Sequence, residues 1–199
     1  MTSRREELLD AAISVLGEHG ARRLTHRAVD AAAGVPAGST SNYFRTRDAL
    51  VKAIVERFTA REQSIWEEIA TTARPTTAAG LTDALAEFAV DATGPRRTLT
   101  LARYALFIEA AQAPSLQEHL TLTREHVLTW AAGWLEEVGS SDPRDDAALL
   151  LDLFDGLLLH QLASPDPAFD PAPRLSALIE ILTAPRDRRR RSSRRTTRS

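Results

Sequence analysis

The chain has 199 residues, of which 43% are apolar and 26% are charged, and its formal net charge is −2. This length allows one ordinary domain or a small domain fused to a larger one, and the apolar content excludes disorder of the whole chain. The absence of cysteine excludes a disulfide framework, a thiolate zinc site and a cysteine nucleophile. No apolar run reaches the roughly 18 residues of a membrane span, and the N-terminus does not resemble a secretory signal, so we expect a cytoplasmic protein.

The near-neutral total hides an uneven distribution of charge along the chain. Residues 1–57 carry nine basic against seven acidic side chains, residues 58–185 carry eight against nineteen, and residues 186–199 carry eight arginines against one aspartate. An acidic body between two basic ends confines the binding of anions to the ends. The arginine-rich tail either contacts DNA phosphates without sequence preference or is a solvated segment without function.

Helical periodicity dominates the sequence and no segment shows convincing strand alternation, so we predict an all-α fold of about nine helices. Leu9, Ala12 and Leu16 share one face of the first helix, which Gly20 ends as a C-cap. The later helices are expected over Thr25–Ala33, Pro36–Phe44, Asp48 to about Thr72, Leu81–Ala92, Arg97–Ala113, Leu116–Val138, Asp145–Ala163 and Leu175–Thr183.

Residues 24–50 read LTHRAVDAAAGVPAGSTSNYFRTRDAL and have the pattern of a helix-turn-helix. Gly34 stands where the turn needs a positive φ or a close approach, and Val35 is the residue expected to pack the turn inward. The helix that follows presents small or polar side chains outward, which lets its backbone approach base edges and supplies hydrogen-bonding groups. The alternative is a plain three-helix unit with the same turn.

The stretch GVPAGSTSNYFRTRDAL resembles the TetR family of transcriptional regulators, whose third helix runs into an aromatic pair followed by a basic residue. The resemblance covers about residues 4–58, and beyond it only the architecture agrees. It implies a helix-turn-helix DNA-binding domain over 1–58 and a larger helical ligand-binding and dimerisation domain over 59–185. The segment 186–199 is too hydrophilic to fold alone and is expected to be a disordered tail. Such a regulator, usually a repressor, is a homodimer that binds double-stranded DNA at a palindromic operator and leaves it when a small-molecule effector binds.

The resemblance also implies which residues meet DNA. Residues at the start of the second helix, together with the tyrosine of the aromatic pair and Arg47 at the start of the fourth helix, are expected at phosphates or at the groove edge. Residues at the exposed start of the recognition helix are expected at base edges. The full set is Thr25, His26, Arg27, Ala37, Gly38, Ser39, Ser41, Asn42, Tyr43 and Arg47.

Two residues depart from the family pattern. Asp30 replaces the small residue usually packed between the two helices, and Thr40 occupies a place more often held by leucine. We expect Asp30 to cap the third helix, because an anion near a helix N-terminus is stabilising.

Family resemblance implies a small-molecule pocket in the second domain, and large or polar side chains on its amphipathic helices are the candidates. A mostly apolar effector fits an aromatic-lined chamber with one or two polar anchors, for which Arg103 and His126 are the choices. The alternative is that the aromatic stripe is plain core. The candidate lining residues are Trp66, Phe88, Arg103, Phe107, His126, Trp130, Trp134 and Phe154.

The segment 145–163 is apolar nearly all round, so it must be covered on several sides. Together with the last helix it is expected to form a four-helix dimer interface with its copy in the partner subunit. The candidate interface residues are Leu150, Phe154, Leu157, Leu158, Gln161, Leu175, Leu178 and Leu182.

The motifs of common enzyme classes are missing from the sequence. There is no G-x-S-x-G, no phosphate-binding glycine loop with a lysine and no G-x-G-x-x-G, so we expect no catalysis and no cofactor. His119 and His126 share a helix face but lie too far apart for one metal ion. The remaining alternative is a dimeric helical DNA-binding or interaction protein without ligand control.

Overall fold

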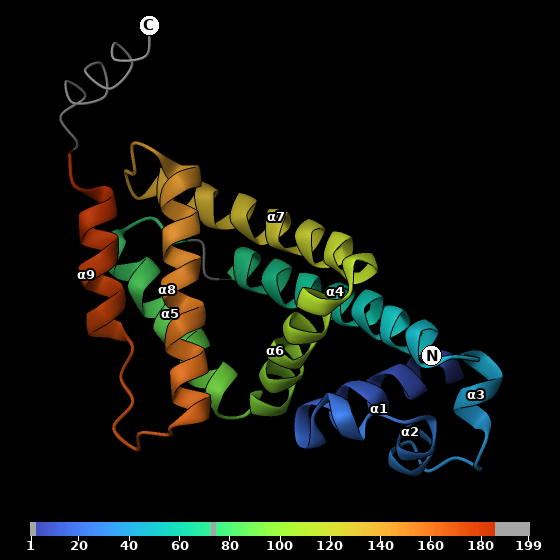
Figure 1. The fold of residues 1–199 in the computed structure, drawn as a ribbon. Coiled ribbons are helices and arrows are strands. Elements are labelled where there is room, and N and C mark those ends of the chain that lie inside the picture. The colour runs from blue at the N-terminus through green and yellow to red at the C-terminus, as the bar shows by residue number, and fades with distance from the viewer. Residues whose placement is uncertain (1–2, 73–74, 186–199) are drawn as a thin grey trace, which may run out of the picture.

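The computed structural model describes residues 3–72 and 75–185, and for residues 66–72, 115 and 119 it describes the backbone alone. Every regular element in these ranges is helical, which confirms the all-α prediction there (Figure 1). None of these helices is both long and apolar enough to cross a membrane. In chain order they are α1 (Arg4–His19), a 3₁₀ turn (Ala21–Arg23), α2 (His26–Ala32), α3 (Ser39–Tyr43), α4 (Arg47–Thr72), α5 (Ala78–Thr93), α6 (Arg97–Gln112), α7 (Pro114–Glu137), α8 (Pro143–Ala163) and α9 (Ala172–Thr183).

Several helices begin before the first residue of their apolar pattern, because capping groups lie outside that pattern. α5 starts at Ala78, where the Thr77 hydroxyl accepts a hydrogen bond from the backbone N–H of Gly80 at 3.1 Å. α8 and α9 each carry a proline in the first turn, a position where the missing N–H costs nothing. The arginine-rich segment predicted to be a disordered tail lies outside the described residues.

The apolar side chains form two clusters. The first cluster joins α1, α2 and the start of α4, and the second joins α5, α7, α8 and α9. α6 takes part in both clusters, since Ala102, Leu106 and Ala110 belong to the first and Tyr104 packs against the second. α4 contributes to the first cluster and then continues without interruption from beside α3 until it lies along α7 (Figure 1).

α1 and α6 approach each other closely at one glycine. A Cβ atom built on Gly17 would lie 2.0 Å from the carbonyl oxygen of Thr98, a residue in the first turn of α6. No side chain fits at that distance, so glycine is needed here for its lack of a side chain. The contact fixes the start of α6 against the helix that carries the DNA-binding unit.

Candidate DNA interface and ligand pocket

Thr25 caps the start of α2, and two glycines shape the turn between α2 and α3. The Thr25 hydroxyl caps α2 by accepting from the backbone N–H of Ala28 at 3.1 Å. Gly34 has a φ of 65° just after α2, and Gly38 has a φ of 93° at the N-cap of α3. Both values lie in the left-handed region that side chains other than glycine rarely adopt, so the turn depends on these two residues.

Asp30 holds the recognition helix in place. Only 4% of this residue is exposed, and its carboxylate accepts hydrogen bonds from Gly38 N at 2.8 Å, from Thr40 N at 2.7 Å and from Thr40 Oγ1 at 2.5 Å. Burial by itself raises the pKa of the Asp30 carboxyl, but these hydrogen bonds outweigh burial and hold the pKa below its ordinary value. The prediction that Asp30 caps α3 is confirmed.

The residues expected at base edges lie on the outer surface of this unit. Ala37, Gly38, Ser41 and Asn42 are exposed and Ser39 is half-buried. The Ser39 hydroxyl donates to the carbonyl of Pro36 at 2.6 Å, and the Ser41 hydroxyl donates to the carbonyl of Gly38 at 2.8 Å, so both retain acceptor capacity. The side-chain amide of Asn42 has no hydrogen-bond partner among the described residues.

The residues expected at phosphates differ in how freely they can move. Arg27 and Tyr43 are exposed, and Tyr43 packs beside the buried ring of Phe44 with centroids 6.4 Å apart. His26 is half-buried, and its Nε2 lies 2.6 Å from the carbonyl oxygen of Phe44. That nitrogen therefore ties the start of α2 to the end of α3.

Arg47 connects the DNA-binding unit to the rest of the molecule. Its Nη1 and Nη2 atoms each lie 3.1 Å from Oε2 of Glu109 on α6, and its side chain is 48% exposed. The residue expected to bind a phosphate of the DNA backbone is therefore paired with a carboxylate of α6, outside the DNA-binding unit. Sequence spacing gives no indication of this pair, because 62 residues separate its members.

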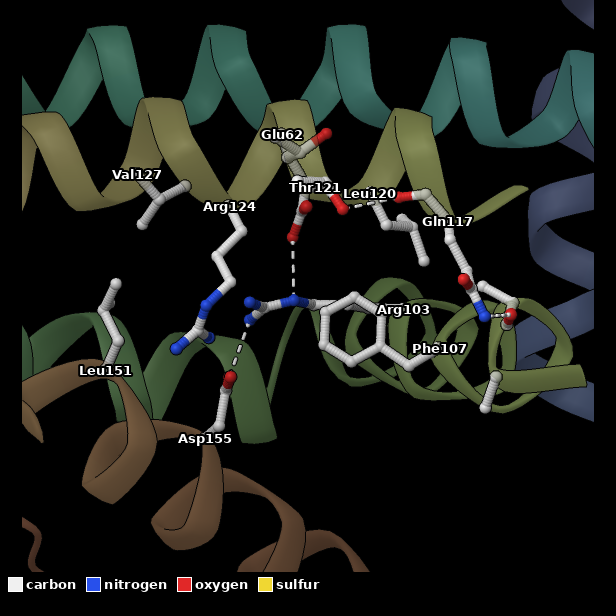
Figure 2. A pocket seen from close by; sticks show the side chains of 13 residues that line it. Glu62, Arg103, Phe107, Gln117, Leu120, Thr121, Arg124, Val127, Leu151 and Asp155 are labelled. Atoms are coloured by element: carbon white, nitrogen blue, oxygen red, sulfur yellow. Dashed lines mark hydrogen bonds and ion pairs between the residues drawn. The ribbon is translucent and has the colours of Figure 1, made fainter. Parts of the chain in front are cut away.

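A pocket of about 370 Å³ lies between α4, α6, α7 and α8 (Figure 2). Arg103 and Phe107 from α6 line it, as expected, together with apolar side chains of α7 and α8. Phe107 lies under the guanidinium of Arg103, whose Cζ is 5.1 Å from the ring centroid. Exposed residues of α7, such as Gln117 and Thr121, stand at its edge, so the pocket reaches the surface.

The other predicted lining residues lie elsewhere. Phe88 and Phe154 stack at 5.7 Å between centroids in the second cluster, where Trp130 and Trp134 also pack. These four therefore follow the alternative reading of the stripe as core. His126 is exposed on another face of α7, and the side chain of Trp66 lies outside the described residues. Helical spacing cannot distinguish a core-facing aromatic residue from one facing a cavity, and a role of these residues in ligand binding stays a prediction.

An ionic group that sequence reasoning missed forms one wall of the pocket. Arg103 Nε lies 3.3 Å from Oε1 of Glu62 on α4, and Arg103 Nη1 lies 3.1 Å from Oδ1 of Asp155 on α8. The side chains of Arg103 and Glu62 are only 14% and 12% exposed. Burial raises the pKa of the Glu62 carboxyl, and the attraction of Arg103 does not fully offset it.

Tyr104 supports this group from the neighbouring position on α6. Its hydroxyl donates a hydrogen bond to the backbone carbonyl of Asp155 at 3.0 Å. Burial and the nearby Asp155 carboxylate raise the pKa of the Tyr104 phenol, so it stays neutral. α6 and α8 are thereby joined beside the pocket.

Most of the predicted dimer-interface residues face the interior of the subunit itself. Gln161 bonds to the backbone of Asp166 through both atoms of its amide, and Leu178 is partly buried. The large apolar side chains exposed on these helices are instead Leu149, Leu159 and Ile181. α5, α7 and α9 cover the other faces of α8, and which residues meet a second subunit stays a prediction. The predicted residues buried in the single chain are Leu150, Phe154, Leu157, Leu158, Leu175 and Leu182.

The exposed helices α2 and α3 are called the reader below, and the helices α5 to α9 are called the second body. Together they define a helix-turn-helix protein with a second helical domain. The family model described as bacterial regulatory proteins, tetR family, matches residues 8–54, and the model described as tetracyclin repressor-like, C-terminal domain, matches residues 76–185. The chain belongs to the TetR family of DNA-binding transcriptional regulators, whose members are not enzymes.

Solved structures agree with this assignment. Multidrug binding protein EbrR in complex with ethidium is 28% identical, with 90% of this chain and 98% of that chain covered and a TM-score of 0.69. A TetR-family member from Streptomyces coelicolor A3 is 26% identical over 92% of this chain and 99% of that chain, with a TM-score of 0.68. A transcriptional regulator from Rhodococcus sp. Rha1, at 24% identity, 90% and 96% coverage and a TM-score of 0.76, shares the fold. No curated protein matches the chain significantly.

Proposed function

We propose that this chain is a homodimeric repressor that binds a palindromic operator and is released from it by a small, mostly apolar molecule bound in the pocket between α4, α6, α7 and α8. The DNA-binding residues are those of the exposed reader, with Ser39, Ser41 and Asn42 at base edges and Arg27, Tyr43 and Arg47 at phosphates. Short polar side chains on an exposed helix can approach bases closely in the major groove.

The observation that carries the proposal is the double role of α6. Ala102, Leu106 and Ala110 pack in the cluster that holds the reader, while Arg103 and Phe107 line the pocket. A molecule that moves the pocket wall therefore also moves a helix packed against α1. Packed helices shift as units rather than deform continuously, so a small displacement at the pocket reaches the reader.

Two further observations support the remaining parts of the proposal. α8 and α9 expose Leu149, Leu159 and Ile181, which suits a four-helix contact with a second subunit. A cavity of about 370 Å³ lies within the usual size range of small-molecule sites. EbrR, which shares this fold, is seen in complexes with ethidium, proflavin and malachite green.

Release requires that the effector bind the DNA-incompetent arrangement of the dimer more tightly than the competent one, since equal affinity would shift nothing. In the competent arrangement the two recognition helices must reach half-sites about 34–36 Å apart, one turn of DNA. The Arg47–Glu109 pair can distinguish the DNA-competent from the DNA-incompetent arrangement, because Arg47 cannot bind a DNA phosphate and Glu109 equally well at the same time.

The proposal is tested by fluorescence anisotropy with DNA that flanks the protein's own gene, and by light scattering of the same sample for the dimer. Asn42→Ala removes an exposed amide and should weaken operator binding by about 1–3 kcal/mol while leaving non-specific binding unchanged. Gln112→Ala, which removes an exposed amide from the end of α6, is the matched control.

Malachite green added to the protein–operator complex should release the operator fragment. The same DNA without protein serves as the blank. A monomer in solution, equal affinity for all DNA fragments, or an operator complex unchanged by every pocket-binding compound would each contradict the proposal.

A further inference from the structure

The ionic wall of the pocket has an excess of negative charge. Glu62 and Asp155 share one arginine, Arg103, and these three side chains together carry a charge of −1. The other arginine that lines the pocket, Arg124, is already paired, with its Nη2 3.0 Å from Oδ1 of Asp152. The five side chains therefore leave one carboxylate without a cation of its own.

Glu62 is the carboxylate with the poorest partner. Its only charged or hydrogen-bonding partner among the described residues is Arg103, whose Nε lies 3.3 Å away, and that buried Nε atom makes no hydrogen bond. A carboxylate has about four acceptor sites, and leaving them unfilled in a buried position is costly. The raised pKa of the Glu62 carboxyl reflects the same deficit.

Apart from Gln117, Thr121 and Thr123, the rest of the pocket lining that carries no charge is apolar. Phe107, Leu120, Val127 and Leu151 line it beside the carboxylate (Figure 2). A molecule that fills this space must combine an apolar body with a group that satisfies a buried anion. The stacking of the Arg103 guanidinium on Phe107 is direct evidence that this environment accommodates a cation against an aromatic ring.

We propose that the molecule that occupies this pocket is an organic cation with an apolar or aromatic body, and that Glu62 is its charge-pairing residue. The inference rests on the proposed function only in taking this pocket as the effector site. The bound cation lies at Glu62 and leaves Arg103 to Asp155, so that each carboxylate has one positive partner. An organic anion would instead have to displace a carboxylate from Arg103 and bring a further negative charge beside two carboxylates that already share one arginine.

Three probes that share a benzyl group and a tetrahedral head test the charge preference: benzyltrimethylammonium, benzyl methyl sulfone and benzylsulfonate. The positive charge of the first is independent of pH. Calorimetry on the full-length protein without DNA should rank the affinities as cation, then neutral compound, then anion, with the cation about tenfold or more above the neutral probe.

Glu62→Gln should remove that advantage and bring the anion up to or above the cation, because it leaves the ionic wall without net charge. Glu118→Gln, the same change at an exposed position of α7 outside the pocket, should leave the ranking unaltered. Asp155→Asn tests the same charge excess from α8 if the first variant does not fold.

Tightest binding of benzylsulfonate, or a cation affinity unaffected by both Glu62→Gln and Asp155→Asn, would overturn the inference. Because these measurements contain no DNA, their outcome is separate from that of the operator experiment. A cation that binds but does not release DNA contradicts the repressor mechanism and supports the assignment of Glu62.

Discussion

Asp30 and Thr40 are unusual for their positions when each is considered alone, and the structure shows that they are one pair. Thr40 is fully buried and gives both its backbone N–H and its hydroxyl to the Asp30 carboxylate. A leucine at position 40 would leave the carboxylate with fewer donors, and a small residue at position 30 would leave the threonine hydroxyl buried without a partner. Each departure therefore requires the other.

Replacing Asp30 by asparagine should destabilise the fold by about 1–3 kcal/mol at neutral pH, because buried donors lose a charged acceptor. The folded-state pKa of Asp30 lies below its ordinary value of 3.8, so its stabilising contribution is full above that value and is lost as the pH falls through the folded-state pKa. Urea unfolding should therefore show that the difference in unfolding free energy between wild type and Asp30→Asn becomes smaller at acidic pH.

Asp83→Asn, at an exposed position of α5, is the control and should change the stability little at any pH. If the difference in unfolding free energy between wild type and Asp30→Asn stayed constant down to strongly acidic pH, the role assigned to the carboxylate would be contradicted.

The charge at Glu62 could have been predicted from the sequence. The apolar pattern of α4 places Phe58 and Ile65 on its inward face, and Glu62 falls between them at spacings of four and three residues. A carboxylate in that position is expected to be buried with a partner. Asp155 could not be singled out in the same way, because α8 also carries Asp152, which is exposed. Their common partner could not have been predicted, since Arg103 lies on a third helix and only the packing brings the three together.

At the scale of helices, the contact between α1 and α6 depends on Gly17. Gly17→Ala would place a methyl group against the Thr98 carbonyl, so the helices must separate or bend. Overpacking of this kind costs about 1–3 kcal/mol, which thermal or urea unfolding will detect. Operator binding should also become less responsive to effector, because the contact that transmits motion of α6 is loosened.

Gly133 provides the matched control for this change. It lies in α7, and a Cβ atom placed on it would meet no other atom within 4 Å, so Gly133→Ala should be neutral or stabilising by up to about 1 kcal/mol. Equal effects of the two alanine substitutions would contradict a special role for the α1–α6 contact.

Helix positions were predictable because apolar periodicity and capping residues are local, whereas the faces used by α7 and α8 were not. Trp130 and Trp134 repeat at helical spacing whether they face a core or a cavity, and here they pack in the core. α8 is apolar nearly all round, so no pattern distinguishes the side that α5, α7 and α9 cover from the side left exposed at Leu149. Such choices depend on which helices pack together, which is a property of the whole fold.

At the scale of the whole molecule, the Arg47–Glu109 ion pair joins the DNA-binding unit to the second body. Glu109→Gln should release Arg47 for a phosphate, so affinity for DNA of any sequence should rise, and a bound effector should weaken DNA binding less than in wild type. Arg47→Gln should lower affinity for all sequences alike and reduce the slope of log affinity against log salt by about one.

Titrations of one operator fragment and one unrelated fragment at several salt concentrations measure both effects. If Glu109→Gln weakened DNA binding, or if Arg47→Gln changed sequence preference with the salt slope intact, Arg47 would not be a phosphate contact in competition with Glu109.

The shared use of α6 also limits how this scaffold can acquire new effectors. Ala102, Leu106 and Ala110 cannot be enlarged without disturbing the cluster around α1, and Arg103 is fixed by two carboxylates from other helices. Exposed residues of α7 such as Thr121 line the pocket but belong neither to that cluster nor to the ionic wall. Laboratory evolution towards a different inducer should therefore accumulate its first successful substitutions on α7, with α6 left nearly unchanged.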